Sequence, residues 1–273
     1  MRTKTQKDNN IPQNWWREGY FFGKRYFYPD NSKEGYLINQ KESLEERTLR
    51  ETNGLINLLG LKEGSKILDA PCGYGRHSIA LSKKAYDVTG IDIDLEHLKK
   101  ASLDSNGLNV RFLKRDLRNI GAHLYNNFDG VINMFYSFGF FQKEEDNFRV
   151  MKEFYNSLRN GGSLLLHTDV SPEMIQNKTT VKECIRTLEN NHKLIILENY
   201  NSKTKRMEGS WETTDEIGKI IFPRAFYSMR IYSSEEFKYM AEKCGFKDVN
   251  VYGSFNGEKF NSESTEMIVV GKK

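Results

Sequence analysis

The chain has 273 residues, enough for one large α/β domain with an elaborated cap or for one domain and a smaller second one. The net charge of +4 at pH 7 is spread along the chain, so nucleic acid is not the expected partner. No apolar run reaches the roughly 18 to 20 residues of a membrane span, and no Cys/His pair has zinc-ligand spacing, so neither a membrane nor a metal is expected. The polar N-terminus and three scattered cysteines favour a cytoplasmic protein without disulfides.

An aromatic arm opens the chain. Residues 15–28 read WWREGYFFGKRYFY, and we assign residues 1–41 to this arm. Its rings could fasten the arm to the domain, or form one wall of a ligand pocket, and the two roles are compatible. Tyr20 and Tyr26 are the candidate substrate-binding residues here.

Five strands alternating with helical patterns follow. An amphipathic helix is predicted over 42–60. The strands are predicted at 66–70, 86–92, 109–113, 128–135 and 163–169, and the helices between them at about 74–84, 95–105 and 144–159. Apolar strands separated by helices are typical of right-handed βαβ units and a parallel sheet.

The pattern changes after Pro172 and then returns to α/β. We predict a short helical stretch near 172–187, and then an antiparallel meander of segments 192–200, 205–214 and 219–232. A helix that starts at Ser233 and ends at Gly245 precedes two strands, at about 247–255 and 265–271, which are too close in sequence for a parallel crossover.

The predicted fold is therefore a doubly wound, mostly parallel, seven-stranded Rossmann-like sheet with an antiparallel last strand and a small antiparallel β insertion. The nucleoside-binding domain would comprise 42–170 and 233–273, and the insertion, at 171–232, would cap the substrate.

The strongest motif is ILDAPCGYGRHS at 67–78, between the first strand and its helix. Gly73 and Gly75 allow a tight turn and a close approach of the backbone to a ligand. Asp92 ends the second strand, where a carboxylate reaches the ribose hydroxyls of a nucleoside.

Two classes of ligand fit this turn, a dinucleotide and S-adenosylmethionine. Asp69 favours the second, because a carboxylate repels a pyrophosphate but attracts the ammonium and sulfonium groups of S-adenosylmethionine. A Gly-rich turn with only a structural role is the remaining alternative.

The pattern D-x-x-C-G-x-G, with the second-strand acid and an Asp near the third strand, resembles class I S-adenosylmethionine-dependent methyltransferases. The similarity extends over WWREGYFFGKRYF, VTGIDIDLEHLKKA, FDGVINMFYSFGFF, LRNGGSLLL and MRIYSSEEF, in the order of a bacterial subfamily of small-molecule type. Pro71 departs from the commoner glycine and stiffens the turn.

The resemblance implies a set of donor-binding residues. Asp69 would face the methionine ammonium, Asp92 the ribose and Asp116 the adenine amino group, although Asp116 could instead cap a turn. The further residues implied are Ala70, Gly73, Gly75, Ile93, Leu117, Asn133, Met134 and Phe135.

Methyl transfer needs aligned reactants, and a general base only when the nucleophile arrives protonated. The candidate catalytic residues are Tyr136, after the fourth strand, and His167, near the end of the fifth. A histidine in a strand can equally have a structural role.

The insertion contributes further acceptor-binding candidates: Trp211, Arg224, Tyr227 and Arg230. An arginine would pair with an anionic group of the acceptor, whereas the aromatic rings could simply pack on a sheet. Uncovered strand edges would also permit a homodimer, so a monomer or a homodimer is expected.

The sequence thus predicts an S-adenosylmethionine-dependent enzyme that methylates N or O of a small molecule. The alternatives are an RNA or protein methyltransferase, a donor-binding protein without turnover, and a nicotinamide oxidoreductase.

Overall fold

The computed structural model describes residues 11–31, 42–175, 181–188 and 191–273. Its contacts divide the chain into two compact units. One consists of Met1–Ile38 and Thr180–Met229, and the other of Asn39–Thr179 and Arg230–Lys273. The aromatic arm and most of the predicted insertion therefore fall in one unit. None of the helices in the described ranges is long and apolar enough to cross a membrane.

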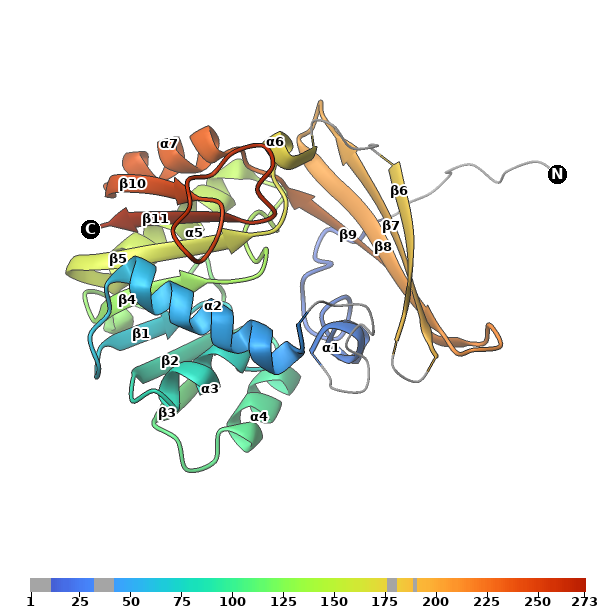
Figure 1. The fold of residues 1–273 in the computed structure, drawn as a ribbon, viewed down its shortest axis with the longest axis horizontal. Helices are drawn as coiled ribbons and strands as arrows, with labels where there is room; N and C mark the ends of the chain where they lie inside the picture. Colours follow the sequence, from blue (N-terminus) through green and yellow to red (C-terminus); the bar gives the residue numbers. More distant parts are fainter. Residues whose placement is uncertain (1–10, 32–41, 176–180, 189–190) are drawn as a thin grey trace. The chain divides into compact units, whose positions relative to one another are not determined.

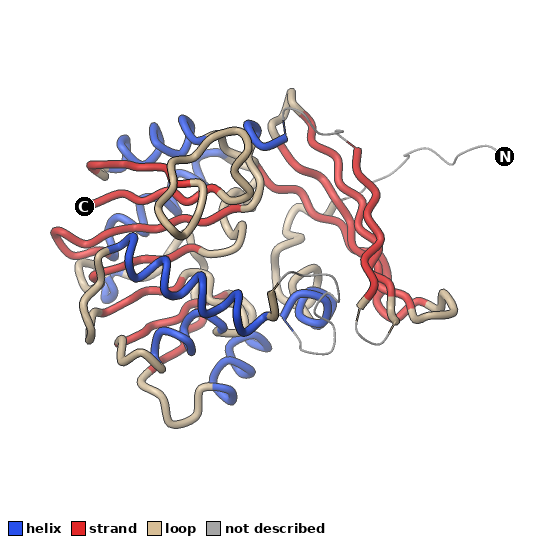
Figure 2. Tube along the Cα trace, viewed as in Figure 1, coloured by secondary structure: helices blue, strands red, loops and turns tan. Residues whose placement is uncertain are grey.

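The larger unit is built on a sheet that has seven strands in the described part of the chain (Figures 1 and 2). These are β1 (Lys66–Asp69), β2 (Asp87–Asp92), β3 (Val110–Lys114), β4 (Phe128–Asn133), β5 (Leu158–Thr168), β10 (Lys247–Tyr252) and β11 (Met267–Lys272). They lie in the order β3-β2-β1-β4-β5-β11-β10. The first five are parallel, and β11 is antiparallel to both β5 and β10, which confirms the predicted fold class.

Helices cover the two faces of this sheet. They are α2 (Leu44–Leu59), α3 (Arg76–Ser82), α4 (Leu95–Asp104), α5 (Glu144–Ser157) and α7 (Ser234–Cys244), with the short helices η1 (Ala122–Leu124) and α6 (Pro172–Ile175). Helix α3 contacts both α2 and α4, whereas α5 contacts α7, so the helices form two layers. Helix α2 begins at Ser43, whose side chain forms a capping box with Glu46, and ends at Gly60 in a left-handed conformation.

The core under α2 is apolar and joins helix to sheet. Leu55 and Leu59 of α2 pack with Ile67, Ile132 and Leu165 from three neighbouring strands. Between β1 and β4 the strand order reverses direction, and in open parallel sheets ligands bind at the carboxyl edge beside this reversal. The fold thus places the ends of β1, β2 and β4 at one candidate site.

The smaller unit contains a four-stranded sheet, as far as the described residues go. Its strands, in spatial order, are β6 (Val181–Thr187), β7 (Lys193–Asn201), β8 (Arg206–Thr214) and β9 (Ile220–Arg230), and helix α1 (Lys24–Asn31) belongs to the arm. The helical stretch predicted near 172–187 is confirmed at Pro172–Ile175, lies outside the described residues at 176–180, and is wrong at 181–187, which is a strand. Its backbone pairs with β7 along its whole length, and this pairing outweighs the local helical pattern.

Aromatic side chains fasten the arm to this sheet. Trp15 is completely buried, and its Nε1 donates to the Ser228 carbonyl over 3.0 Å. The Phe21 ring lies 4.9 Å from Tyr227 and 5.5 Å from Trp211, measured between centroids, and Tyr26 stacks on Trp211 at 5.5 Å. The predicted fastening role of the arm is therefore present within this unit.

The chain leaves the larger unit and returns to it at two tied positions. Glu173, in α6, accepts hydrogen bonds from the backbone N–H of Ser234 at 2.7 Å and from its hydroxyl at 2.8 Å. The Arg230 N–H donates to the Gly139 carbonyl at 2.8 Å, and a Cβ at Gly139 would lie 2.2 Å from the Arg230 oxygen. Position 139 therefore requires glycine, because the chain passes close to it where it re-enters the larger unit at Arg230.

Candidate active site

The turn after β1 approaches a ligand through bare backbone. Gly73 has a φ of +53°, and no heavy atom lies within 4 Å of the position that its Cβ would take. Gly75 has a φ of +78°, and its Cβ would lie 2.9 Å from the Ala101 Cβ, so the helix packs closely there. Open space over Gly73 and close packing under Gly75 form a cradle at the start of α3.

Asp69 is a buried acid at the end of β1. Its carboxylate accepts from the Ser78 hydroxyl at 2.6 Å and is 1% exposed. Burial raises the pKa of Asp69 to about 7, against the opposing effects of Ser78 and of the Arg76 charge. A cationic ligand would stabilise the ionised form of this carboxyl group, so the site fits the predicted methyl donor.

Asp92 closes the same cradle from the end of β2. One carboxylate oxygen accepts from the Gly73 N–H at 2.9 Å, and the other accepts from the Asp94 N–H at 2.8 Å. Each oxygen keeps further acceptor capacity. Ile93 follows in a half-buried position. The acid therefore holds the glycine turn in place and could also accept from ribose hydroxyls.

Asp116 lies just after β3 and is bound by a neighbouring arginine. Its two oxygens accept from Arg118 Nε at 3.0 Å and Nη2 at 2.7 Å, and Oδ1 also accepts from the Arg118 N–H. This is the turn-capping geometry that we kept as an alternative. Leu117 beside it is buried.

The chain after β4 has an unusual backbone. Phe135 and Tyr136 have φ values of +59° and +61°, which side-chain-bearing residues rarely adopt. Before them, the Asn133 amide donates to the carbonyls of Ala70 at 2.7 Å and of Ser137 at 3.1 Å, and so joins this turn to the turn after β1. Met134, which lies between Asn133 and Phe135 in the sequence, is buried.

His167 holds this turn from β5. Its Nδ1 accepts from the Phe135 N–H at 3.2 Å, and its carbonyl accepts from the Tyr136 N–H at 3.0 Å. The side chain is buried, and burial lowers the pKa of His167 to about 3. At neutral pH the ring is therefore uncharged, with its proton on Nε2.

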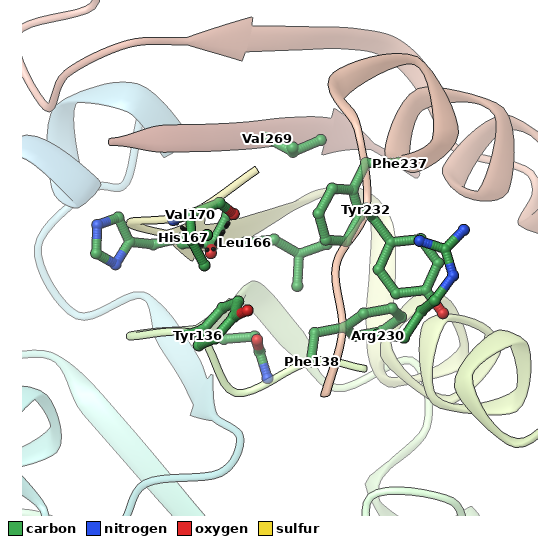
Figure 3. A pocket seen from close by; sticks show the side chains of 11 residues that line it. Tyr136, Phe138, Leu166, His167, Val170, Arg230, Tyr232, Phe237 and Val269 are labelled. Carbon is green, nitrogen blue, oxygen red and sulfur yellow. Dashed lines mark hydrogen bonds between the residues drawn. The ribbon is translucent and has the colours of Figure 1, made fainter. Parts of the chain in front are cut away.

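A small pocket lies at the carboxyl ends of β4 and β5 (Figure 3). Aromatic side chains of Tyr136, Phe138, Tyr232 and Phe237 line it, and the His167 ring is turned away from them. Arg230 also lines it, with its guanidinium 2.7 Å from Glu236 and 4.5 Å from the Tyr232 ring. Tyr136 and Arg230, two of the predicted site residues, thus line the same pocket.

The other acceptor-binding candidates lie in the smaller unit. Tyr26, Trp211 and Tyr227 surround Phe21, and the Tyr20 hydroxyl accepts from the Phe226 N–H at 3.2 Å. Arg224 is 36% exposed at its side chain and lies 3.3 Å from Glu212. The aromatic candidates therefore gather in one cluster, and Arg224 lies on the surface.

The sequence interpretation missed a buried charge cluster on α2. Glu51 is fully buried and contacts Arg47 at 2.8 Å, Arg76 at 2.7 Å and His77 at 2.8 Å. Burial alone would raise the pKa of Glu51, but the His77 hydrogen bond and the two arginines hold it well below its usual range. A charged residue within the apolar stripe of a predicted amphipathic helix was the available signal.

Comparisons with known proteins agree with this geometry. Residues 67–162 match the family model described as a methyltransferase domain. A glycine/sarcosine N-methyltransferase of Aphanothece halophytica is 26% identical over 263 residues, which cover 90% of this chain and 91% of the relative. The chain therefore carries a methyltransferase domain, and it is similar over most of its length to an N-methyltransferase. Its methyl donor is therefore S-adenosylmethionine.

Solved structures of methyltransferases share the fold. The CcbJ methyltransferase of Streptomyces caelestis superposes with a TM-score of 0.72 at 16% identity, over 81% of this methyltransferase and 88% of that chain. CalS10 is an amino pentose methyltransferase from Micromonospora echinaspora that was solved with bound S-adenosylmethionine. It superposes with a TM-score of 0.64 at 18% identity, over 85% of this chain and 93% of that chain. At these identities the likeness concerns the architecture alone.

Proposed function

We propose that the protein transfers a methyl group from S-adenosylmethionine to a nitrogen or oxygen atom of a small-molecule acceptor. One observation carries the donor assignment: a buried carboxylate, Asp69, lies beside an open glycine turn that Asp92 closes. A cation is favoured next to such a carboxylate, and an anionic dinucleotide phosphate is not.

The protein's residues bind and orient the donor, and the sulfonium of the bound donor supplies an activated methyl group. Asp69 would face the donor ammonium, and Asp92 would accept from the ribose hydroxyls. The backbone of Ala70, Gly73 and Gly75 would approach the donor closely. Ile93, Asp116 and Leu117 would enclose the adenine, and Asn133, Met134 and Phe135 would close the methionine side.

Tyr136 and His167 would act on the acceptor side in different ways. Tyr136 lines the pocket and is the candidate to touch the acceptor. His167 is buried, with Nδ1 occupied by the Phe135 N–H, and this geometry favours positioning of the turn over proton transfer. Alignment of the reactants and exclusion of water supply most of what such a displacement requires.

Acceptor recognition would come from the remaining candidates. Arg230 lines the pocket, and the arm (1–41) together with the insertion (171–232) would act as the substrate cap, with Tyr20, Tyr26, Trp211, Arg224 and Tyr227 as its candidate contacts. The glycine/sarcosine N-methyltransferase that is similar over 90% of this chain supports nitrogen as the methylated atom. We propose a cytoplasmic monomer or homodimer without nucleic-acid or membrane partners.

A ligand-binding experiment tests the donor assignment. S-adenosylhomocysteine at about 100 times its Kd should stabilise the protein by about 2.7 kcal/mol, which raises Tm by about 5 to 10 °C in a chain of this size. NAD and NADP should leave Tm unchanged. Stabilisation by a dinucleotide instead would overturn the proposal.

A turnover experiment separates an enzyme from a donor-binding protein. Purified protein, S-adenosylmethionine and a pool of small amines and alcohols should release S-adenosylhomocysteine. Binding without release from any pool would favour a protein without turnover, and release only with RNA or protein added would favour a macromolecular acceptor.

A further inference from the structure

A buried charge cluster on α2 touches both segments that form the candidate donor site. The cluster comprises Glu51, Arg47, Arg76 and His77, and we call it the Glu51 cluster. Helix α2 precedes residues 67–162, the stretch that matches the methyltransferase domain. Arg47 and Glu51 therefore lie outside the matched region, whereas Arg76 and His77 lie within it.

One side of the Glu51 cluster reaches the glycine turn. Arg76 and His77 form the start of α3, directly after Gly75. Both donate to the same oxygen of Glu51, at 2.7 Å and 2.8 Å, and Arg76 also donates to the Thr48 hydroxyl at 3.0 Å. Glu51 therefore fixes the first turn of α3, the helix that directly follows the glycine turn.

The other side reaches the strained turn after β4. Arg47 bonds the second oxygen of Glu51 at 2.8 Å, and its guanidinium lies 4.2 Å from the centroid of the Phe135 ring. Phe135 has a positive φ, and His167 accepts its N–H. A cation over the ring therefore holds the Phe135 side chain while His167 holds its backbone.

The cluster also separates charges near the site. Arg76 acts electrostatically on Asp69, the carboxylate proposed to face the donor ammonium. Because Glu51 binds the Arg76 guanidinium directly, Arg76 is drawn toward α2. Without that anion, Arg76 would be free to pair with Asp69 and compete with the donor cation.

We propose that Glu51 is a positioning residue for the methyl-donor site, acting on the glycine turn through Arg76 and His77 and on the Phe135 turn through Arg47. It is not a catalytic residue, because its contacts are with the protein. The inference rests on the proposed function, since it assumes that the donor binds between these turns.

Replacing the Glu51 carboxylate by an uncharged amide of the same shape tests whether Glu51 positions the donor site. Glu51→Gln should raise the Kd for S-adenosylhomocysteine at least tenfold, measured by calorimetry on the full chain below its Tm. The KM for S-adenosylmethionine should rise by a similar factor, and kcat at saturating donor should change less. An unchanged Kd and KM would overturn the proposal.

Two controls separate positioning from stability. Glu45→Gln removes an exposed acid from the same helix and should leave Kd and Tm unchanged. Val150→Ala opens a cavity in α5, where Val150 is 2% exposed, and should lower Tm without changing Kd. If Val150→Ala raised Kd as much as Glu51→Gln for the same loss of Tm, Glu51 would be merely structural.

A second variant covers the case in which Glu51→Gln does not fold. Arg47→Met keeps the aliphatic stem and removes the charge over Phe135, so it should also raise the donor Kd. Where both variants fold, the double variant should lose less binding free energy than the sum of the two single losses, because Glu51 and Arg47 act through one contact. Full additivity would show that the two residues act separately. Failure of wild-type protein to bind S-adenosylhomocysteine would instead refute the proposed function.

Discussion

At the scale of single residues, Asp69 is a carboxyl group whose ionisation opposes folding. Its pKa in the folded protein, about 7, lies above the ordinary value of 3.8. Between these pH values the folded state binds more protons than the unfolded state, so this group's contribution to stability falls as pH rises. The folded protein thus carries an unfavourable buried charge at neutral pH that a bound cation would offset.

Asp69→Asn should therefore separate stability from binding. Without ligand at pH 8, the variant should be more stable than wild type by about 1 kcal/mol or more, that is, a Tm roughly 2 to 4 °C higher per kcal/mol. The difference should shrink as pH falls and vanish only below about pH 3.8, where Asp69 is protonated in the folded and the unfolded protein alike. Thermal melts across this range measure it, and a variant that is less stable at pH 8 would contradict the prediction.

Donor binding should show the matching pH dependence. A cationic donor favours ionised Asp69, so the wild-type Kd for S-adenosylmethionine should fall by up to about tenfold per pH unit as pH rises toward 7. It should level off above that pH. In Asp69→Asn the Kd should be weak and nearly independent of pH over the same range, and an equally steep dependence in the variant would assign the titration to another group.

At the scale of elements, the aromatic arm is held by one deeply buried ring. Trp15→Ala would remove a fully buried indole and its hydrogen bond to Ser228, at a cost of about 3 to 5 kcal/mol. Cleavage of the arm by a protease should accelerate, and urea unfolding followed by circular dichroism should shift to lower midpoint. Ile217→Ala, at an 83% exposed side chain of the same unit, is the control and should change neither.

The elements also show where local sequence suffices. The strands at 66–69 and 87–92 were predictable because apolar residues run between a helix end and a turn, and each is buried along most of its length. Segment 181–187 was not, because its conformation depends on pairing with β7 and not on its own pattern.

The same limit applies to the site. Glycines and acids at strand ends were visible in the sequence. The contacts of Glu51 with Arg76 and His77, and of His167 with Phe135, join residues 25 or more positions apart.

At the scale of the whole molecule, the charge is modest. A net charge of +4 over 273 residues offers little attraction to a polyanion, and Arg76, Arg118 and Arg230 are paired to acids. Purified protein should therefore show no measurable retention of homopolymer RNA at about 0.15 M ionic strength. Filter binding measures this, and salt-sensitive retention at that ionic strength would favour a nucleic-acid acceptor.

The tie between Glu173 and Ser234 has a consequence for how such enzymes diversify. It fastens together the two places where the chain departs from the larger unit and rejoins it, so the stretch between them behaves as a module inserted into a closed frame. A foreign module of similar end-to-end spacing could be spliced in at these positions while the seven-stranded frame stays intact. If the insertion and the arm recognise the acceptor as proposed above, exchange of these two segments would be enough to change the compound that the enzyme accepts.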